Sequence, residues 1–393
     1  MKITSVDILA LPGSEAAAFR PIICRVNTDE GIYGLGEAGV AIVTGARAGL
    51  EMIKDLSKLI IGMNPLHHEV IWEKMFKQGF WTQGNGAIEM AAISAIDTAL
   101  WDIKGKYHNA PVHELLGGKQ REKLRTYASQ LQFGWGVPKF IPQIEPEQYA
   151  EAAIKAVEEG YSAIKINVLR YDDKGQMLSH LDSTGYLSRK MMKLAEARLA
   201  AMRDAVGDSV DILLENHAMT DAAVAVQFGR VAEKYDIMFL EEAAMPMNPK
   251  VMAQVADKIS IPLASGERSY TRWGFLPFFE NGSLSIIQPD IGNCGGITEC
   301  KKIADMAHIY DVSVQTHVCS SPISVAVSLQ LEAAIPNFVI HEHHLTNATK
   351  DNTDLCVHNY QPVNGYFDVP DLPGIGQDLS EFALKHAEVH TVK

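Results

Sequence analysis

Three short apolar segments of this 393-residue chain each end in a glutamate, and the glutamates are evenly spaced. The segments VDILLE, IMFLE and IPLASGE end at Glu215, Glu241 and Glu267, so 26 residues separate each acid from the next. That distance fits a strand followed by a helix, repeated along the chain. The carboxyl ends of parallel barrel strands lie at one face, and three carboxylates gathered there suit a hard divalent cation. The spacing therefore predicts a parallel strand–helix fold that carries a metal site.

Eight segments of this kind alternate with segments of helical period between Lys123 and His344. The strand candidates are, in order, KLRTYASQL, SAIKINVL, VDILLEN, IMFLEEA, IPLASGE, SLSIIQPD, VSVQTHV and FVIHEHH. Eight strands that alternate with helices favour a closed parallel barrel over an open sheet. The last helical segment precedes the eighth strand, so we expect the α/β class and a modified TIM-type (β/α)7β barrel.

The first third of the chain has another pattern, with strand-like segments first and helical segments afterwards. The clearest helix candidate is AIEMAAISAIDTALWDIKGK, which has apolar residues on one face. Strands followed by helices without alternation predict a separate α+β domain. We therefore expect an α+β domain at residues 1–122, the barrel at 123–345, and a C-terminal segment, 346–393, that packs back on the first domain.

Composition argues against several classes of function. The formal net charge is −13 and no basic cluster follows an expected helix, so no nucleic-acid partner is expected. No apolar segment reaches the roughly 18 residues that a membrane span needs, so no membrane partner is expected. Five cysteines without a CxxC pair are typical of a reduced compartment. We expect a soluble, cytoplasmic protein that acts on a small molecule.

Later strand ends carry groups that are suited to proton transfer. The sixth expected strand ends at Asp290, the seventh at His317, and the eighth contains Glu342. A carboxylate on a neighbouring strand can hold an imidazole ring, fix its tautomer and raise its basicity. A lone histidine is more often a core residue, but the adjacent metal site favours a catalytic pair of His317 and Asp290.

Alternation along a strand predicts which other polar side chains share the site, because residues i and i+2 face the same side. By this rule His217 faces the side of Glu215, and Asn167 faces the side of Lys165. Lys165 could bind a substrate carboxylate, act as a base with a lowered pKa, or lie at the surface. The three histidines that flank Glu342 fall on two faces, so they do not predict a zinc site.

One connection, after the second strand, is unusually long. Residues 170–186 are polar, contain glycine and show no clean period. A loop of this length is usually functional, although it could equally be a decoration, and the sequence leaves both readings open.

Together these features resemble the enolase superfamily, within it the mandelate racemase-like subgroup and its acid-sugar (galactonate-type) dehydratases. The resemblance covers nearly the whole chain, through TDEGIYGLGEA, AISAIDTALWDIKGK, IPLASGER, IIQPDIGNCGGITECKKIADMA and the closing PGIG. It implies a capping domain at residues 1–122, a homo-oligomer, bound Mg2+, a His–Asp dyad, and an eighth-strand acid that hydrogen-bonds the substrate carboxylate. The matching residues are Glu215, Glu241 and Glu267 for the metal, His317 and Asp290 for the dyad, and Glu342.

Three positions refine what the resemblance implies. Asn167 stands where the racemases carry a second lysine base, which argues against racemisation because that reaction needs opposed proton donors and acceptors. His217 matches the acid that protonates the leaving hydroxyl in galactonate-type dehydratases. The first metal ligand is Glu215 where those enzymes have aspartate, which leaves the identity of the sugar acid open.

The resemblance implies dehydration of a sugar acid, with an aldonate expected, to a 2-keto-3-deoxy acid through an enediolate. His317 would take the α-proton, His217 would protonate the departing hydroxyl, and Lys165, Asn167 and Glu342 would bind the substrate. Capping-domain loops at residues 13–20 and near Trp81 would close over the sugar. The alternatives are a cycloisomerase or epimerase that abstracts the same proton, and a non-catalytic binding protein.

Overall fold

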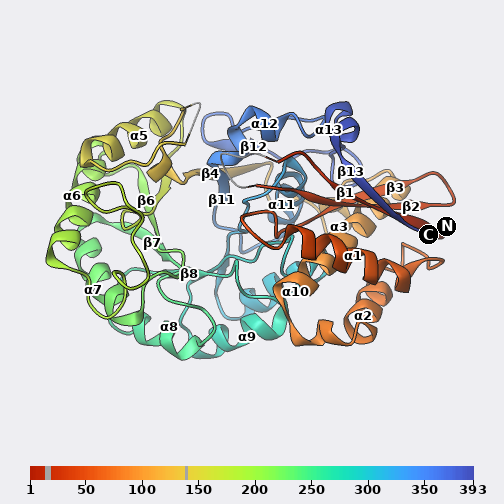
Figure 1. Cartoon of the computed structure of the whole chain (residues 1–393), viewed down its shortest axis with the longest axis horizontal. Helices are drawn as coiled ribbons and strands as arrows, with labels where there is room; N and C mark the ends of the chain where they lie inside the picture. The colour runs from red at the N-terminus through yellow and green to blue at the C-terminus, as the bar shows by residue number, and fades with distance from the viewer. Residues whose placement is uncertain (14–18, 138–139) are drawn as a thin grey trace.

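The computed structural model of the chain describes residues 1–13, 19–137 and 140–393. Figure 1 shows a ring of strands and helices from the middle of the chain, beside a smaller unit that contains both termini. The larger sheet is parallel throughout its ring and the smaller sheet is antiparallel. The expected (β/α)7β barrel with an α+β capping domain is confirmed.

In the described part of the chain, eight parallel strands form the ring, and all eight were expected. They are β4 (Lys123–Ser129), β5 (Ala163–Ile166), β6 (Asp211–Glu215), β7 (Ile237–Glu241), β8 (Leu263–Ser265), β9 (Ile286–Ile287), β10 (Ser313–Val314) and β11 (His341–His344). The hydrogen-bonded order runs from β10 through β9 to β4 and then to β11. A parallel bridge between Val314 and Phe338, just before β11, closes the ring.

Among the described residues, seven helices fill the connections between these strands. They are α5 (Pro146–Glu158), α6 (Arg189–Val206), α7 (Ala222–Ala232), α8 (Pro249–Ala256), α9 (Thr271–Asn281), α10 (Gly296–Ile309) and α11 (Pro322–Ala334). Figure 1 shows α5 to α9 around the outer side of the ring. Side chains of Ser188, Asp221 and Ser321 accept backbone N–H bonds at the starts of α6, α7 and α11, which satisfies donors left free there.

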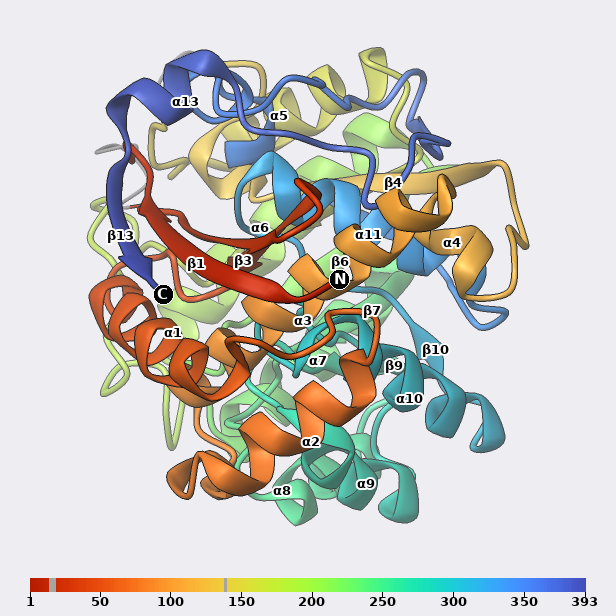
Figure 2. The same ribbon diagram turned by 90° about the vertical axis from the view of Figure 1, so that its right-hand side faces the viewer.

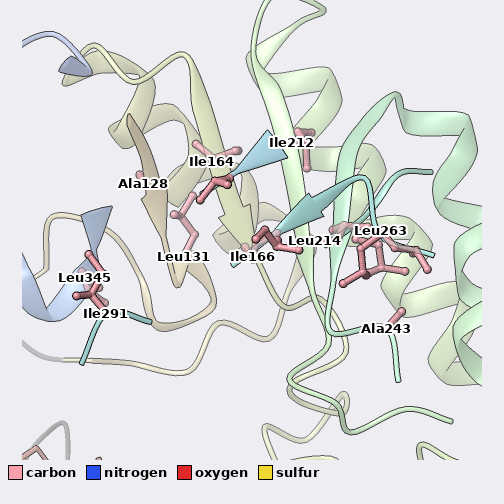
Figure 3. Close-up of a cluster of buried hydrophobic side chains, with 14 of the residues drawn as sticks. Ala128, Leu131, Ile164, Ile166, Ile212, Leu214, Ala243, Leu263, Ile291 and Leu345 are labelled. Carbon is pink, nitrogen blue, oxygen red and sulfur yellow. The ribbon is translucent and has the colours of Figure 1, made fainter. Parts of the chain in front are cut away.

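Alternation along the strands makes two apolar layers, one inside the ring and one under the helices. Ile164, Ile166, Ile212 and Leu214 belong to the outer layer (Figure 3). The inner layer consists of Tyr127, Ala163, Leu213, Phe239, Ala264, Ile286 and Ile340. Two residues after four of these inner positions stand Lys165, Glu215, Glu241 and Glu342. Period-two alternation therefore carries these charged side chains to the inside of the ring at the carboxyl ends of the strands.

The capping domain is an antiparallel sheet covered by helices. Its elements are β1 (Ile3–Ala10), β2 (Ile22–Thr28), β3 (Tyr33–Ala38), α1 (Ala46–Ile60), α2 (His68–Gln78), the 3-10 turn η1 (Trp81–Gly84), α3 (Ala87–His108) and α4 (Val112–Leu115). Helix α3 packs on β3 and on α10 of the barrel. A Cβ added at Gly34 or Gly36 would lie 2.0 or 2.1 Å from carbonyl oxygens of α3. These glycines therefore let the helix lie directly on the strand backbone.

The C-terminal segment contacts both parts of the molecule. It contains η4 (Leu345–Ala348), α12 (Lys350–Thr353), β12 (Tyr366–Asp368), α13 (Glu381–His386) and β13 (Glu388–Val392). The barrel also contains two 3-10 turns, η2 (Leu131–Phe133) and η3 (Glu233–Tyr235). Strand β13 pairs with β1 of the capping domain, beside which it runs in Figure 2. Strand β12 instead pairs with β4 of the barrel. The segment thus ties the two parts together, and its boundary at residue 345, like that at 122, stays a prediction.

Two smaller expectations concern the membrane and the cysteines. Within residues 1–13, 19–137 and 140–393, no helix has both the length and the apolar character needed to cross a membrane. All five cysteines are free and buried.

Candidate active site

Three carboxylates meet at the carboxyl ends of β6, β7 and β8. Oxygen atoms of Glu215, Glu241 and Glu267 lie within 4.8 Å of one another. Glu215 and Glu241 are the last residues of their strands and stand opposite each other in the parallel register. Glu267 follows β8 through Gly266, where an added Cβ would lie 2.5 Å from the backbone of Gln288. Glycine at this position lets the end of β8 approach the next strand closely.

A buried ammonium group lies among these carboxylates. Lys165 Nζ is 2.6 Å from Glu241 Oε2, 2.9 Å from Glu342 Oε1 and 3.4 Å from Glu215 Oε2. The Lys165 side chain is 1% exposed. Of the three possibilities that the sequence left open, a surface lysine is therefore excluded. Burial lowers the pKa of Lys165, but the Glu241 and Glu342 carboxylates outweigh it and raise that pKa well above its ordinary value. In this arrangement Lys165 is a fixed cation.

The carboxylate triad still has free capacity to bind a cation. Among the described residues, Glu241 Oε1 is buried without a hydrogen-bond partner. Leaving such an atom unpaired costs about 1–3 kcal/mol. Burial also raises the pKa of Glu241 well above its ordinary value, and a divalent cation would reverse that effect. The donor set, three buried carboxylates with an orphaned oxygen, therefore fits a hard divalent metal ion.

His317 and Asp290 form a hydrogen-bonded pair beside the triad. His317 Nδ1 lies 2.7 Å from Asp290 Oδ2, and the backbone N–H of Gly292 donates to Asp290 Oδ1 at 2.7 Å. The other ring nitrogen, Nε2, is 3.3 Å from Glu267 Oε2. Burial lowers the pKa of His317, but the Glu267 and Asp290 carboxylates raise it to about 10. A cation bound to Glu267 would weaken this effect and favour the basic form of the ring.

Glu342 is held as an anion by several donors. Its Oε1 accepts from Ser129 Oγ at 2.8 Å and from Lys165, and its Oε2 accepts the backbone N–H of Val318 at 3.0 Å. Burial raises the pKa of Glu342, but Lys165 and His317 outweigh it and hold that pKa well below its usual range. Glu342 therefore links the first, second and seventh strands around the site.

The histidines next to Glu342 divide between two faces, as alternation predicted. His341 Nδ1 contacts Glu332 at 2.6 Å, and His343 Nδ1 contacts the Tyr161 hydroxyl at 2.5 Å. Both rings are buried in the outer layer. His344 instead lines the pocket described below, so the sequence reasoning, which treated all three as scattered strand-end residues, missed a pocket residue.

His217 reaches the site through a turn rather than along an extended strand. Strand β6 ends at Glu215, and His217 and Ala218 have φ values of 50° and 53°. The alternation rule placed His217 beside Glu215, but the left-handed turn is what aims its ring. Burial lowers the pKa of His217 to about 4. Asn167 Nδ2 lies 3.1 Å from His217 Nδ1, so Asn167 contacts this ring.

A pocket of about 820 Å³ joins these groups to the capping domain. Barrel residues in its wall include Lys165, Glu215, His217, Glu267 and His317, whereas Asn167 is not among the lining residues. The capping domain contributes a wall formed by Phe19, Gly39, Val40, Ile42, Val43 and Thr44.

Two of the expected closing loops have different outcomes. The loop at residues 13–20 falls partly on residues 14–18, outside the described residues, and its Phe19 lines the pocket. Closure of the region near Trp81 stays a prediction; the Trp81 side chain itself is 75% exposed and is not among the residues that line the pocket. The turn at residues 39–44 does line the pocket, because β3 ends beside the barrel, where Gly39 N donates to Gly292 O at 2.9 Å.

Several pocket residues escaped the sequence reasoning. They include Gln130, Arg170, Tyr171, Arg268, Tyr270 and His344. Gln130 directly follows β4, so the strand-end rule that found the acids was a sufficient signal for it. Arg170 and Tyr171 begin the long loop, whose remainder lines a separate cavity of about 710 Å³ beside the start of α6. Only the first residues of that loop belong to this site.

Two protein families match this chain. The family described as enolase C-terminal domain-like matches residues 148–383, more than half of the chain. The mandelate racemase / muconate lactonizing enzyme N-terminal domain matches residues 14–117. The chain belongs to the enolase superfamily. Enzymes of this superfamily use a divalent metal, in agreement with the acidic triad.

Relatives across the superfamily match over almost the full length. The D-galactonate dehydratases of Ralstonia pickettii and Pectobacterium atrosepticum are each 32% identical, over 97% of this chain and 93% of theirs. A solved enolase superfamily member from Salmonella Typhimurium is 56% identical, with a TM-score of 0.97 and complete coverage of both chains. A provisionally named dehydratase from Zymomonas mobilis is 50% identical, with a TM-score of 0.97 over 100% of this chain and 99% of its own.

Proposed function

We propose that this protein is an acid-sugar dehydratase, a hydro-lyase that converts a sugar acid, first of all an aldonate, to a 2-keto-3-deoxy acid. One observation carries the proposal: a hydrogen-bonded His–Asp pair, a second histidine and a carboxylate triad meet at one pocket. The similarity to D-galactonate dehydratases supports the class of reaction. Cytoplasmic location and assembly into a homo-oligomer are further parts of the proposal.

The triad would hold Mg2+, with Glu215, Glu241 and Glu267 as its ligands. When bound, the ion supplies positive charge that attracts an anionic substrate and stabilises an enediolate. Lys165 adds a second fixed positive charge at the same place, and Glu342 accepts hydrogen bonds that orient the substrate carboxyl group.

The proton transfers would be divided between the two histidines. His317, oriented by Asp290, takes the proton from C2 of the substrate at Nε2. The electron pair left at C2 becomes the C2=C3 double bond as the C3–O bond breaks. The departing oxygen takes a proton from His217 and leaves as water. The enol then becomes the 2-keto-3-deoxy acid: C3 gains the proton held by His317, and the C2 hydroxyl loses its proton, which restores the ring of His217.

A screen of acid sugars tests this proposal. The protein would be incubated with Mg2+ and a stereochemically complete panel of aldonates and aldarates, and 2-keto acid would be detected as its semicarbazone. We expect turnover of at least one substrate, and its loss in Glu241→Gln. Absence of both product and α-proton exchange across the panel would contradict the proposal.

The division of labour has its own test. In His217→Asn, deuterium exchange at C2 should continue because His317 is intact, whereas dehydration should fall by a factor of about 100 to 10,000. Equal loss of exchange and dehydration would show that the two histidines do not have separate roles.

A further inference from the structure

The ring of His217 is contacted by amide side chains at both of its nitrogen atoms. Asn167 Nδ2 lies 3.1 Å from Nδ1, and Gln130 Nε2 lies 3.4 Å from Nε2. Gln130 lines the pocket and is 7% exposed, and its φ of 75° turns it out of the line of β4 toward this ring. The proton transfers proposed above use neither amide, and Asn167, which was expected to bind substrate, is not among the residues that line the pocket.

The Asn167 amide determines which nitrogen of His217 carries the proton. The backbone N–H of Leu169 donates to Asn167 Oδ1 at 3.0 Å, so the amide oxygen is turned away from the ring. The Nδ2 group that faces the ring can only donate. Nδ1 of His217 is therefore an acceptor, and the proton of the neutral ring lies on Nε2, toward the pocket.

A chain of amides fixes the orientation of Gln130 in the same way. The backbone N–H of Asn167 donates to Gln132 Oε1 at 3.2 Å. The Gln132 amide nitrogen must then be its donor end, and it donates to Gln130 Oε1. This leaves the Gln130 amide nitrogen facing His217. Two donors, Gln130 Nε2–H and His217 Nε2–H, therefore face each other at the pocket wall without an acceptor between them.

We propose that Gln130 and His217 together form a two-donor site for one substrate oxygen, the C3 hydroxyl that departs, with Asn167 as the residue that positions the proton. The inference rests on the proposed dehydration and names the groups that recognise the leaving oxygen. An oxygen that accepts from both donors satisfies both, and it does so best as negative charge grows on it during C–O cleavage. Asn167 occupies the position at which a racemase would need a second base, and here it would support dehydration by positioning the proton of His217.

Gln130→Glu tests the second donor. The new carboxylate can still accept from Gln132, but it places an acceptor where the donor stood. We expect dehydration to fall about 100-fold, while deuterium exchange at C2, which depends on His317, changes less than about two-fold. Gln227→Glu, on α7 outside the pocket wall, is the matched control and should leave both rates unchanged. Equal loss of both rates, or no loss of dehydration, would overturn the two-donor site.

A readout that needs no turnover separates this inference from the proposed reaction. In protein labelled with 15N-histidine, the His217 signals are assigned by their loss in His217→Asn. We expect a protonated Nε2 in the wild type, and transfer of the proton to Nδ1 in Asn167→Asp, whose carboxylate accepts. A wild-type proton on Nδ1, or no change in Asn167→Asp, would overturn the inference even if the protein dehydrates sugar acids. Failure of every substrate with the expected tautomers intact would instead count against the proposed function.

Discussion

His317 and Lys165 each contact a carboxylate of the triad Glu215, Glu241 and Glu267, so the pKa of each of these two groups depends on what else the carboxylates bind. His317 Nε2 is 3.3 Å from Glu267, and Lys165 Nζ is 2.6 Å from Glu241. A cation bound to Glu267 competes with the proton on His317 for the same negative charge. The Lys165 ammonium would add a second positive charge beside the same carboxylates. A bound metal ion, His317 and Lys165 would therefore all interact with the same group of carboxylates, and each would change the pKa of the others.

Replacing His317 with asparagine should remove the base. We expect α-proton exchange to fall by a factor of about 100 to 10,000, because His317 is the histidine of the described pocket residues whose ring is hydrogen-bonded to a carboxylate, that of Asp290. Deuterium incorporation at C2 in D2O, with Mg2+ present, measures it. His308→Asn, at an exposed position of α10, is the control. Exchange at the wild-type rate in His317→Asn would show that another residue is the base.

Replacing Lys165 with methionine should leave its buried carboxylate partners without a cation. We expect the free energy of unfolding without metal to fall by about 3–5 kcal/mol, as for other broken buried ion pairs. Mg2+ should restore part of that loss, so the mutant should gain more from Mg2+ than the wild type does. Urea denaturation with and without Mg2+ measures both, with exposed Lys190→Met as control. Equal gains would show that Lys165 and the metal are independent.

At the scale of elements, the start of α10 is docked on α3 of the capping domain. Asp97 on α3 accepts from the backbone N–H of Thr298 at 2.9 Å and from its hydroxyl at 2.6 Å, and Trp101 Nε1 donates to the same hydroxyl. Gly296 has a φ of 83°, and an added Cβ would lie 2.4 Å from the Asp97 carboxylate. A carboxylate at a helix start is favourable, but full burial opposes its charge.

Burial of Asp97 makes stability depend on pH. Burial raises the pKa of Asp97 to about 7, against the hydrogen bonds from Thr298 that lower it. Since this pKa is higher in the folded than in the unfolded chain, Asp97 contributes most to stability below about pH 4. That contribution is lost as pH rises to about 7, by at most about 1.4 kcal/mol per pH unit.

Asp97→Asn removes this titration. The unfolding free energy of the mutant relative to the wild type should therefore rise between about pH 4 and 7 and stay level above it. Urea denaturation across this range measures the difference. Exposed Asp55→Asn on α1 should give no such rise. A constant difference across the range would mean that Asp97 is ionised throughout.

At the scale of the whole molecule, the pocket has walls from the barrel and from the capping domain. Strand β13 on β1 and strand β12 on β4 make one C-terminal segment span both parts. A substrate in this pocket would therefore bear on the arrangement of two domains, while the three proposed metal ligands all belong to the barrel.

Mg2+ should stabilise the whole chain against unfolding. At a concentration 100 times its dissociation constant, binding to the folded state alone adds about 2.7 kcal/mol. Thermal denaturation of chelator-treated protein, with Mg2+ added back, measures the rise in Tm. Glu241→Gln should abolish most of that rise, whereas Glu51→Gln, exposed on α1, should leave it intact. An equal rise in both variants would place the stabilising ion elsewhere.

The sequence by itself determined the barrel and the phase of its functional residues. Strand period and strand–helix spacing are local properties, so eight strands and the strand-end residues Glu215, Glu241 and Glu342 followed from pattern alone. The same strand-end rule applies to Gln130, which directly follows β4 and also lines the pocket. The roles given to these residues stay predictions.

Only the tertiary structure decided how side chains from distant segments meet. The turn at residues 39–44 was not singled out in the sequence, and it lines the pocket because the packing of the two domains places it there. His217 is aimed by a left-handed turn, and its tautomer follows from the orientation of Asn167. Hydrogen-bond direction depends on partners far apart in the chain, so no local pattern predicts it.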